Sequence, residues 1–188
     1  MQAARRVADA LLDVGAVHFN VDKPFVFTSG TLSPVYVDCR KLISFPKERR
    51  VVVDCAMEMI ELSLGMGSFD VVAGGETAGI PFAAWVADRA DAPMVYVRKA
   101  PKSFGRQAQI EGELVPGQRV LLVEDLVFDA GSKKRFCEAL TTAGAVVEHV
   151  LVVFDYGQAA AREELAAMGV KLHSLTTCAT VLDVARGR

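Results

Sequence analysis

A short apolar run that ends in two acidic residues and a small-residue loop constrains the fold of this chain more than any other feature. Residues 120–123 predict a buried strand, and Glu124 and Asp125 close it. A turn at 130–131 follows, and a helix is expected over 132–140. Ligands of α/β proteins bind at the carboxyl ends of parallel strands, where the first N–H groups of the next helix can hold an anion. The stretch therefore predicts a βα unit with an anion site.

Ser132, at the expected start of that helix, leaves two roles open: an N-cap or a phosphate contact. The unit also admits a plainer interpretation, in which Glu124 and Asp125 are merely solvated. It is not a Walker motif, because residues 131–133 read Gly-Ser-Lys and that motif requires Gly-Lys-Ser. The small-residue loop at 74–79 fails the dinucleotide fingerprint, but its accessible N–H groups suit an anion.

Helical and extended patterns alternate from residue 46 onward, which is typical of a doubly wound, mainly parallel sheet. The expected helices cover residues 3–14, 46–64, 80–89, 132–140, 159–168 and 179–185. The expected strands cover residues 17–20, 25–27, 35–38, 70–73, 93–97, 120–123, 146–154 and 170–175. We therefore predict a single α/β domain over residues 1–188, with an N-terminal helix and a small hood in 1–45 and the core in 46–188.

A loop without periodicity is expected over residues 100–118, and it carries positive charge at its start. Arg98, Lys99, Lys102 and Arg106 lie within one short segment, just before the strand that ends in the acidic pair. The plainer interpretation is a solvated charged loop. Cations followed by carboxylates also suit a polyphosphate with its Mg²⁺, because cations bind phosphate oxygens and carboxylates bind hydroxyls or metal. A loop this long in a compact domain is usually functional or disordered.

Charge and composition limit the partners of the chain. The net charge of −2 favours neither nucleic acid nor an anionic membrane, and no apolar run approaches membrane-spanning length. We therefore expect no nucleic-acid and no membrane partner. The cysteines contain no CxxC pair and favour a reduced, cytoplasmic protein. The three histidines are dispersed, and we expect surface or strand-end residues rather than zinc ligands: His18, His149 and His173.

Several short motifs occur in a fixed order along nearly the whole chain. They stand at residues 27–34, 38–42, 74–81, 96–99, 110–112 and 123–125, with Lys102, Gly105, Gly131 and Ser132 between and after them. Their joint order and spacing resemble the type I phosphoribosyltransferases, and within them the orotate phosphoribosyltransferases. The resemblance implies transfer of a phosphoribosyl group from phosphoribosyl diphosphate to orotate in pyrimidine biosynthesis, with Mg²⁺ as cofactor. It also implies a homodimer in which the loop at 100–112 reaches the neighbouring active site.

The resemblance assigns roles residue by residue. It assigns catalysis to Lys102, Glu124 and Asp125, with Asp125 near the Mg²⁺ shell, directly or through water. The residues it assigns to phosphoribosyl diphosphate are Arg98, Lys99, Lys102, Glu124, Asp125, Leu126, Val127, Phe128, Asp129, Ala130, Gly131 and Ser132. The residues it assigns to orotate are Thr28, Ser29, Val35, Tyr36, Phe128 and Tyr156.

The chain departs from the family pattern at positions that contact substrate. Val127 and Phe128 stand where most members have hydroxyl side chains for the 5′-phosphate, and Ala130 replaces a glycine. Tyr156 stands where many members have the arginine that grips the orotate carboxylate, and Thr28 replaces a common lysine. Two alternatives therefore stay open: a catalytically weak relative with a regulatory or binding role, and transfer to a different nucleobase.

Overall fold

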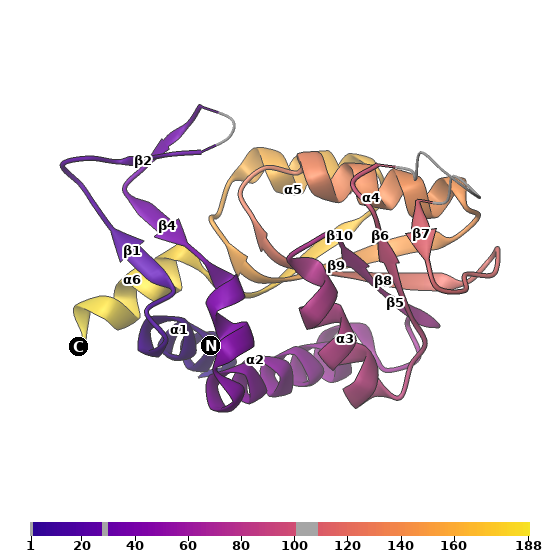
Figure 1. The fold of residues 1–188 in the computed structure, drawn as a ribbon, viewed down its shortest axis with the longest axis horizontal. Helices are drawn as coiled ribbons and strands as arrows, with labels where there is room; N and C mark the ends of the chain where they lie inside the picture. Colours follow the sequence, from indigo (N-terminus) through magenta and orange to yellow (C-terminus); the bar gives the residue numbers. More distant parts are fainter. Residues whose placement is uncertain (1, 28–29, 101–108) are drawn as a thin grey trace.

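The computed structural model describes residues 2–27, 30–100 and 109–188, and a twisted sheet forms their centre (Figure 1). Its strands, in the described part of the chain, lie in the order β10-β9-β8-β5-β6-β7. All neighbours are parallel except β6 and β7, which are antiparallel. The strands are β5 (Val71–Gly75), β6 (Met94–Val97), β7 (Ile110–Glu111), β8 (Arg119–Val127), β9 (Val146–Asp155) and β10 (Lys171–Thr177). The predicted mainly parallel α/β sheet is confirmed.

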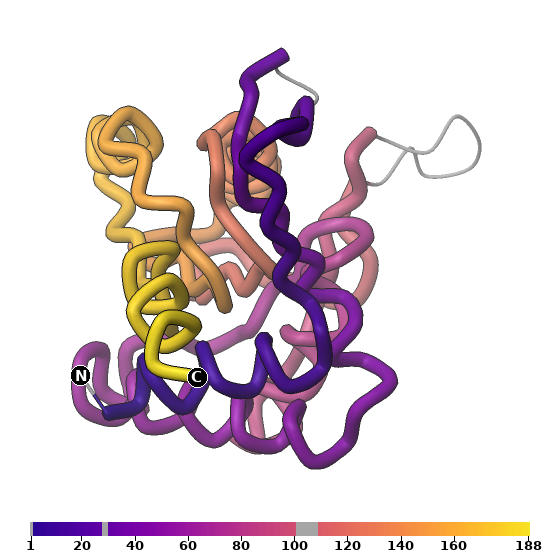
Figure 2. Tube along the Cα trace, turned by 90° about the vertical axis from the view of Figure 1, so that its left-hand side faces the viewer, coloured from indigo at the N-terminus to yellow at the C-terminus, as the bar shows by residue number. Residues whose placement is uncertain are grey.

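Helices cover both faces of the sheet, as a doubly wound fold requires (Figures 1 and 2). One face carries α4 (Gly131–Thr142) and α5 (Ala159–Ala167). The other carries α1 (Gln2–Asp13), α2 (Pro46–Met59) with its π turn η2 (Ile60–Leu64), α3 (Gly79–Ala90) and α6 (Cys178–Arg186). In Figure 2 the two chain ends lie near one another, where Arg188 at the end of the chain pairs with Asp9 and Asp13 of α1.

An arm of short antiparallel strands rises from the body beside α4 and α5 (Figure 2). It consists of two strand pairs, β1 (Val17–Phe19) with β4 (Val35–Val37) and β2 (Phe25–Val26) with β3 (Leu32–Ser33). A 3₁₀ helix, η1 (Cys39–Ser44), leads from the arm to α2. Helix α1 packs against α2 and α6 rather than on the arm, so the hood predicted within 1–45 is formed by residues 17–37.

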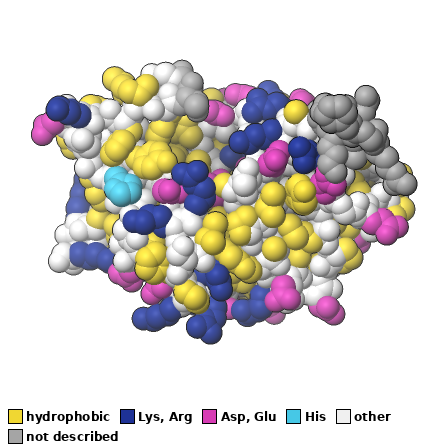
Figure 3. Space-filling view, viewed as in Figure 1, with side chains coloured by type: hydrophobic (Ala, Val, Ile, Leu, Met, Phe, Trp, Pro, Cys, Tyr) yellow, Lys and Arg dark blue, Asp and Glu magenta, His cyan; other side chains and the backbone are white. Residues whose placement is uncertain are grey.

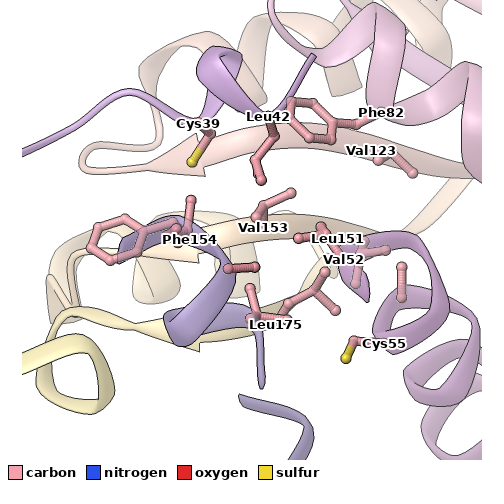
Figure 4. Packing of buried hydrophobic residues seen from close by; sticks show 14 of the residues in the cluster. Cys39, Leu42, Val52, Cys55, Phe82, Val123, Leu151, Val153, Phe154 and Leu175 are labelled. Atoms are coloured by element: carbon pink, nitrogen blue, oxygen red, sulfur yellow. The ribbon is translucent and has the colours of Figure 1, made fainter. Parts of the chain in front are cut away.

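Two hydrophobic clusters, one on each face of the sheet, hold the layers together. Along β8, Leu121 and Val123 point to the α2 and α3 side, whereas Val120 and Leu122 point to the α4 side. Figure 4 shows the first cluster, where Val153 and its neighbours on the sheet meet side chains of α2 and α3. Each fully buried aliphatic side chain contributes about 1.5–3 kcal/mol to folding. Strands covered on both faces read as continuous apolar runs, which is why the sequence revealed them.

Three differences from the sequence-based expectation lie next to the acidic pair or in the stretch that follows β6. Strand β8 continues to Val127, so Glu124 and Asp125 lie inside it rather than closing it. Its last residues pair with β9 as far as Val127 opposite Asp155, and such long-range pairing leaves no local signal. Helix α4 begins at Gly131, one residue earlier than expected. The stretch 100–118, expected to be irregular, contains the short strand β7, which pairs with the edge strand β6.

The remaining sequence-based predictions concern cysteines and membranes. All four cysteines are free: Cys39, Cys55 and Cys137 are buried, and Cys178 is half-buried. Across residues 2–27, 30–100 and 109–188, no helix is long and apolar enough to cross a membrane.

The expectation that the histidines are dispersed surface or strand-end residues is wrong for two of them. His149 and His173 lie inside β9 and β10, and the parallel register brings them to neighbouring positions. His173 Nε2 lies 3.2 Å from His149 Nδ1, and His173 is only 8% exposed. Burial lowers the pKa of both rings, that of His173 from 6.5 to about 4.

This pair predicts a loss of stability in mild acid. Because the folded pKa of His173 lies below its unfolded value of 6.5, the unfolded chain binds the proton more readily. Its contribution is present above pH 6.5 and is lost as the pH falls towards 4. The free energy of unfolding, measured with urea, should fall between pH 7 and pH 4.5. We expect this fall to be about 1 kcal/mol smaller in His173→Phe than in the wild type. The exposed His18 provides the control. If His18→Gln reduced the acid-dependent fall in stability as much as His173→Phe does, the role given to His173 would be contradicted.

Candidate active site

A pocket of about 500 Å³ lies at the carboxyl ends of the central strands, under the arm. Strands β8 and β9, the loop after β5, the start of α4 and the base of the arm all contribute to it. The lining residues are Phe27, Tyr36, Val37, Asp38, Arg40, Ala78, Asp125, Leu126, Phe128, Asp129, Gly131, Ser132, Lys133, Arg135 and Tyr156. Figure 3 shows acidic, basic and hydrophobic side chains side by side at the base of the arm. The place agrees with the ligand site expected of an open parallel sheet.

Glu124 directly precedes the pocket residue Asp125, is not itself among the lining residues and is 5% exposed. Its Oε2 atom is 3.5 Å from the ammonium of Lys133, which is also 5% exposed. Its Oε1 atom has no hydrogen-bond partner among the described residues. Gly75 and Gly79 make room for the carboxylate, because a Cβ atom at either position would collide with it. A buried acceptor without a partner is costly, so this atom is a candidate for contact with a ligand hydroxyl.

Burial and the charge of Lys133 shift the pKa values of the two carboxyl groups in opposite directions. Burial raises the pKa of Glu124 to about 7, while the Lys133 ammonium opposes the rise and the neighbouring Asp125 adds to it. Burial likewise raises the pKa of Asp125, and Lys133 again opposes it. A single buried cation therefore favours the charged form of both acids. Perturbed carboxyl groups in a cleft are typical of functional sites.

The loop between β8 and α4 forms a small cradle. Asp129 Oδ1 accepts a hydrogen bond from the Gly131 N–H at 3.0 Å, which shapes the turn. The N-cap of α4 is Ala130, without a side-chain bond, so the N-cap role considered for Ser132 is wrong. Ser132 lies in the first turn and lines the pocket, with its hydroxyl 3.2 Å from Lys133 Nζ. First-turn N–H groups lack intrahelical acceptors and can bind an anion such as phosphate.

Three aromatic rings form one wall of the pocket. Phe27 from the arm, Phe128 from the cradle and Tyr156 after β9 pack edge to face, with ring centroids 4.5–5.3 Å apart. Phe128 thus lies in the wall beside the other two rings. The Tyr156 hydroxyl accepts a hydrogen bond from the Val37 N–H at 3.0 Å, which ties the arm to the end of β9. The wall offers ring faces and edges suited to a flat heterocycle.

Many of the residues selected from the sequence come together here, and others do not. Those that line the pocket are Tyr36, Asp125, Leu126, Phe128, Asp129, Gly131, Ser132 and Tyr156. Val35, Val127 and Ala130 are buried in the hydrophobic clusters, so their side chains do not line the pocket. Arg98 and Lys99 lie beyond the pocket at the end of β6, where Arg98 Nη1 is 3.8 Å from Glu111 Oε1. Thr28, Ser29 and Lys102 fall outside the described residues.

Sequence reasoning missed several charged residues of this pocket. Lys133 follows Ser132 directly, but only the fold shows that it turns inward to Glu124. Arg135 lies one turn further along α4. Asp38 and Arg40 belonged to a motif recognised in the sequence, yet no local pattern indicated that the arm would bring them over the sheet.

The acidic groups suit a substrate-bound Mg²⁺ better than a dedicated metal cage. Across the described residues, no group of three or more His, Cys, Asp or Glu side chains could hold a metal ion. Magnesium is commonly bound through one or two carboxylates together with substrate phosphates and waters. Asp125, half-buried and lining the pocket, supplies oxygen donors of that kind.

Comparisons with known proteins place these features in a family context. The family model described as "Phosphoribosyl transferase domain" matches residues 46–177. The chain is 54% identical over 184 residues to an orotate phosphoribosyltransferase of Jannaschia sp., covering 97% of this chain and 81% of the relative. It is 53% identical over 188 residues to that of Dinoroseobacter shibae, covering 100% and 83%. The crystal structure of orotate phosphoribosyltransferase from Aeropyrum pernix is similar with a TM-score of 0.81 at 34% identity, covering 97% of this chain and 99% of that one.

Proposed function

The chain belongs to the orotate phosphoribosyltransferase family, and from that premise we infer how its pocket works. It transfers the phosphoribosyl group from phosphoribosyl diphosphate to orotate, giving orotidine 5′-monophosphate and diphosphate in pyrimidine biosynthesis. The observation that carries this function is agreement along the whole chain with relatives of that name. The roles of individual residues, the metal, the oligomeric state and the compartment are our proposals.

We assign the ends of the substrate to opposite sides of the pocket. The first turn of α4, with Ser132 and the backbone of the 128–131 loop, binds the 5′-phosphate. Glu124, through its unpartnered Oε1, and Asp125 accept hydrogen bonds from the ribose hydroxyls. The aromatic wall of Phe27, Phe128 and Tyr156 packs against the base. Charge complementarity supports this orientation of the substrate, because it puts the 5′-phosphate at the N-terminus of α4 and the base beside the aromatic wall.

The reaction needs charge stabilisation rather than a protein nucleophile. Positive charge develops on the ribose C1′ as diphosphate leaves, and the carboxylates near the ribose stabilise it. Bound Mg²⁺ would neutralise diphosphate oxygens, with Asp125 as its protein neighbour. The cradle and the carboxylates hold the ribose between base and leaving group, which lowers the entropic cost of reaction. The arm and the basic loop exclude water that would otherwise compete with the base.

We also propose a homodimer in the cytoplasm, with the loop at 100–112 reaching the neighbouring active site. Arg98, Lys99 and Lys102 then bind the diphosphate, and Lys102 contributes most to the chemical step. Four free thiols suit a reducing compartment, which supports the cytoplasmic assignment.

The decisive assay follows the loss of orotate absorbance with purified protein, phosphoribosyl diphosphate and Mg²⁺. We expect turnover that requires all three, and chelation of Mg²⁺ should abolish it. Folded protein that binds phosphoribosyl diphosphate but leaves orotate unchanged would contradict the function and favour another base or a regulatory role.

Lys102→Ala is expected to lower turnover about 100-fold or more, because it removes a cation that stabilises the leaving diphosphate. Thermal unfolding should change little, and Lys47→Ala, at an exposed position of α2, provides a control with the same loss of charge. In mixed dimers, Lys102→Ala and Asp125→Asn subunits should recover part of the activity. The absence of any recovery in verified heterodimers would contradict a shared site.

A further inference from the structure

The pocket must also distinguish orotate from other pyrimidines, and the described residues show which side chain is suited to this. Orotate differs from uracil by a ring carboxylate, so recognition calls for a cation on the aromatic side. Tyr156 supplies no charge there: its hydroxyl accepts the Val37 N–H and can offer only one neutral O–H donor. Of the cations in the described part of the pocket, Lys133 pairs with Glu124. Arg135 lies on α4 beside the phosphate cradle, with Nη1 close to Gly131.

Arg40 is the remaining cation, and it lies in η1, directly after the arm. It lies at the second position of η1, whose buried Cys39 and Leu42 anchor the segment in the core. Its guanidinium Nη2 lies 3.5 Å from the hydroxyl of Tyr36, a pocket residue that stacks near Phe25. This places Arg40 on the Tyr36 side of the pocket, where its charge also interacts with Asp125.

The guanidinium is held in a defined orientation by one neighbour. Asp38 Oδ1 accepts hydrogen bonds from Arg40 Nε at 2.6 Å and from its backbone N–H at 3.2 Å. These bonds occupy the Nε side of the fork, and Nη1 makes no hydrogen bond to any residue that the structure describes. An arginine held in this way offers its two terminal nitrogens to a second carboxylate in a bidentate pair. The Arg40 side chain is 56% exposed, so it can receive a ligand without breaking a buried contact.

We propose that Arg40 is the specificity-determining residue that binds the orotate carboxylate. The inference rests on the proposed function and deepens it. The base lies against Phe27, Phe128 and Tyr156, and its carboxylate points to the start of η1, where Asp38 holds Arg40. Arg40 selects the base and leaves the phosphate end of the pocket unchanged.

The test compares two nucleotides that differ by this carboxylate alone. Orotidine 5′-monophosphate and uridine 5′-monophosphate are titrated by calorimetry into wild-type protein, Arg40→Met, Arg40→Lys and Lys41→Met. Lys41 is the matched control, because it is the adjacent cation and its Nζ donates to the Gly15 carbonyl at 2.9 Å. Phosphoribosyl diphosphate binding is measured in parallel.

We expect Arg40→Met to weaken orotidine 5′-monophosphate about 10- to 100-fold, the usual loss for a charge-assisted hydrogen-bonded pair. Binding of uridine 5′-monophosphate and phosphoribosyl diphosphate should stay within about 3-fold, Arg40→Lys should be intermediate, and Lys41→Met should resemble wild type. Equal weakening of both nucleotides, or weaker phosphoribosyl diphosphate binding, would assign Arg40 to phosphate and overturn the proposal. If Arg40→Met keeps the wild-type preference for orotidine 5′-monophosphate over uridine 5′-monophosphate, and the wild-type protein turns over orotate, this inference alone is overturned. A wild-type protein without orotate turnover overturns the proposed function as well.

Discussion

Replacing Gly79 with alanine is expected to destabilise the protein by about 3 kcal/mol, although alanine favours a helix by about 1 kcal/mol over glycine. Gly79 begins α3, where an added Cβ would lie 2.8 Å from the Val123 carbonyl and would collide with Glu124 Oε1. The carbonyl belongs to the central strand β8 and cannot move without breaking the pairing with its neighbours. The carboxylate would have to turn away from the pocket. Stability and activity should therefore fall together.

Thermal unfolding should show this change as a decrease in Tm of about 6–12 °C, given about 2–4 °C per kcal/mol for a domain of this size. Gly67→Ala is the matched control, because its added Cβ would meet nothing within 4 Å and its φ is not in the left-handed region. A Gly79→Ala variant as stable as Gly67→Ala would show that the close packing of α3 on β8 is not as described.

Replacing Lys133 with methionine is the second change with a large expected effect. Methionine keeps much of the side-chain volume but leaves the Glu124 carboxylate buried without its cation. Breaking one side of a buried ion pair costs about 3–5 kcal/mol, and we expect about 3 kcal/mol at pH 8. Phosphoribosyl diphosphate binding should weaken as well, because a neutral Glu124 is a poorer acceptor for the ribose hydroxyls.

The loss should depend on pH with a defined sign. The folded pKa of Glu124, about 7, lies above its unfolded value of 4.5, so the folded state takes up a proton between these values. The stability linked to this proton is present below pH 4.5 and is lost as the pH rises through 7. Without Lys133 the folded pKa rises further, and the variant should lose only about 1 kcal/mol at pH 5, where Glu124 is protonated.

Two further variants separate the ion pair from simple packing. Lys134→Met removes the neighbouring cation, which pairs with Glu164 at the surface, and should change stability little at either pH. Lys133→Met combined with Glu124→Met replaces the whole pair by apolar groups and should recover stability while abolishing substrate binding. A loss in Lys133→Met that is equal at pH 5 and pH 8 would contradict the role given to Glu124.

The sequence by itself determined the fold class and the position of the site along the chain. Residues 120–123 are buried on both faces of the sheet, and such strands are visible as apolar runs without knowledge of their partners. The loop at 130–131 and the periodic stretch after it predicted the start of α4 to within one residue, because local backbone preferences set it. The ordered motifs gave the family before any side chain had a position.

Only the tertiary structure decided which side chains meet. Val127 and Phe128 are adjacent in sequence, yet one is buried in the core and the other lines the pocket, because β8 ends at Val127 and Phe128 begins the loop that follows. Lys133 meets Glu124 across the first turn of α4, and Arg40 reaches the pocket because η1 packs against β8. His149 and His173 are 24 residues apart in the sequence and come together through the register of β9 and β10. These contacts depend on long-range packing and strand pairing, for which a local sequence pattern carries no signal.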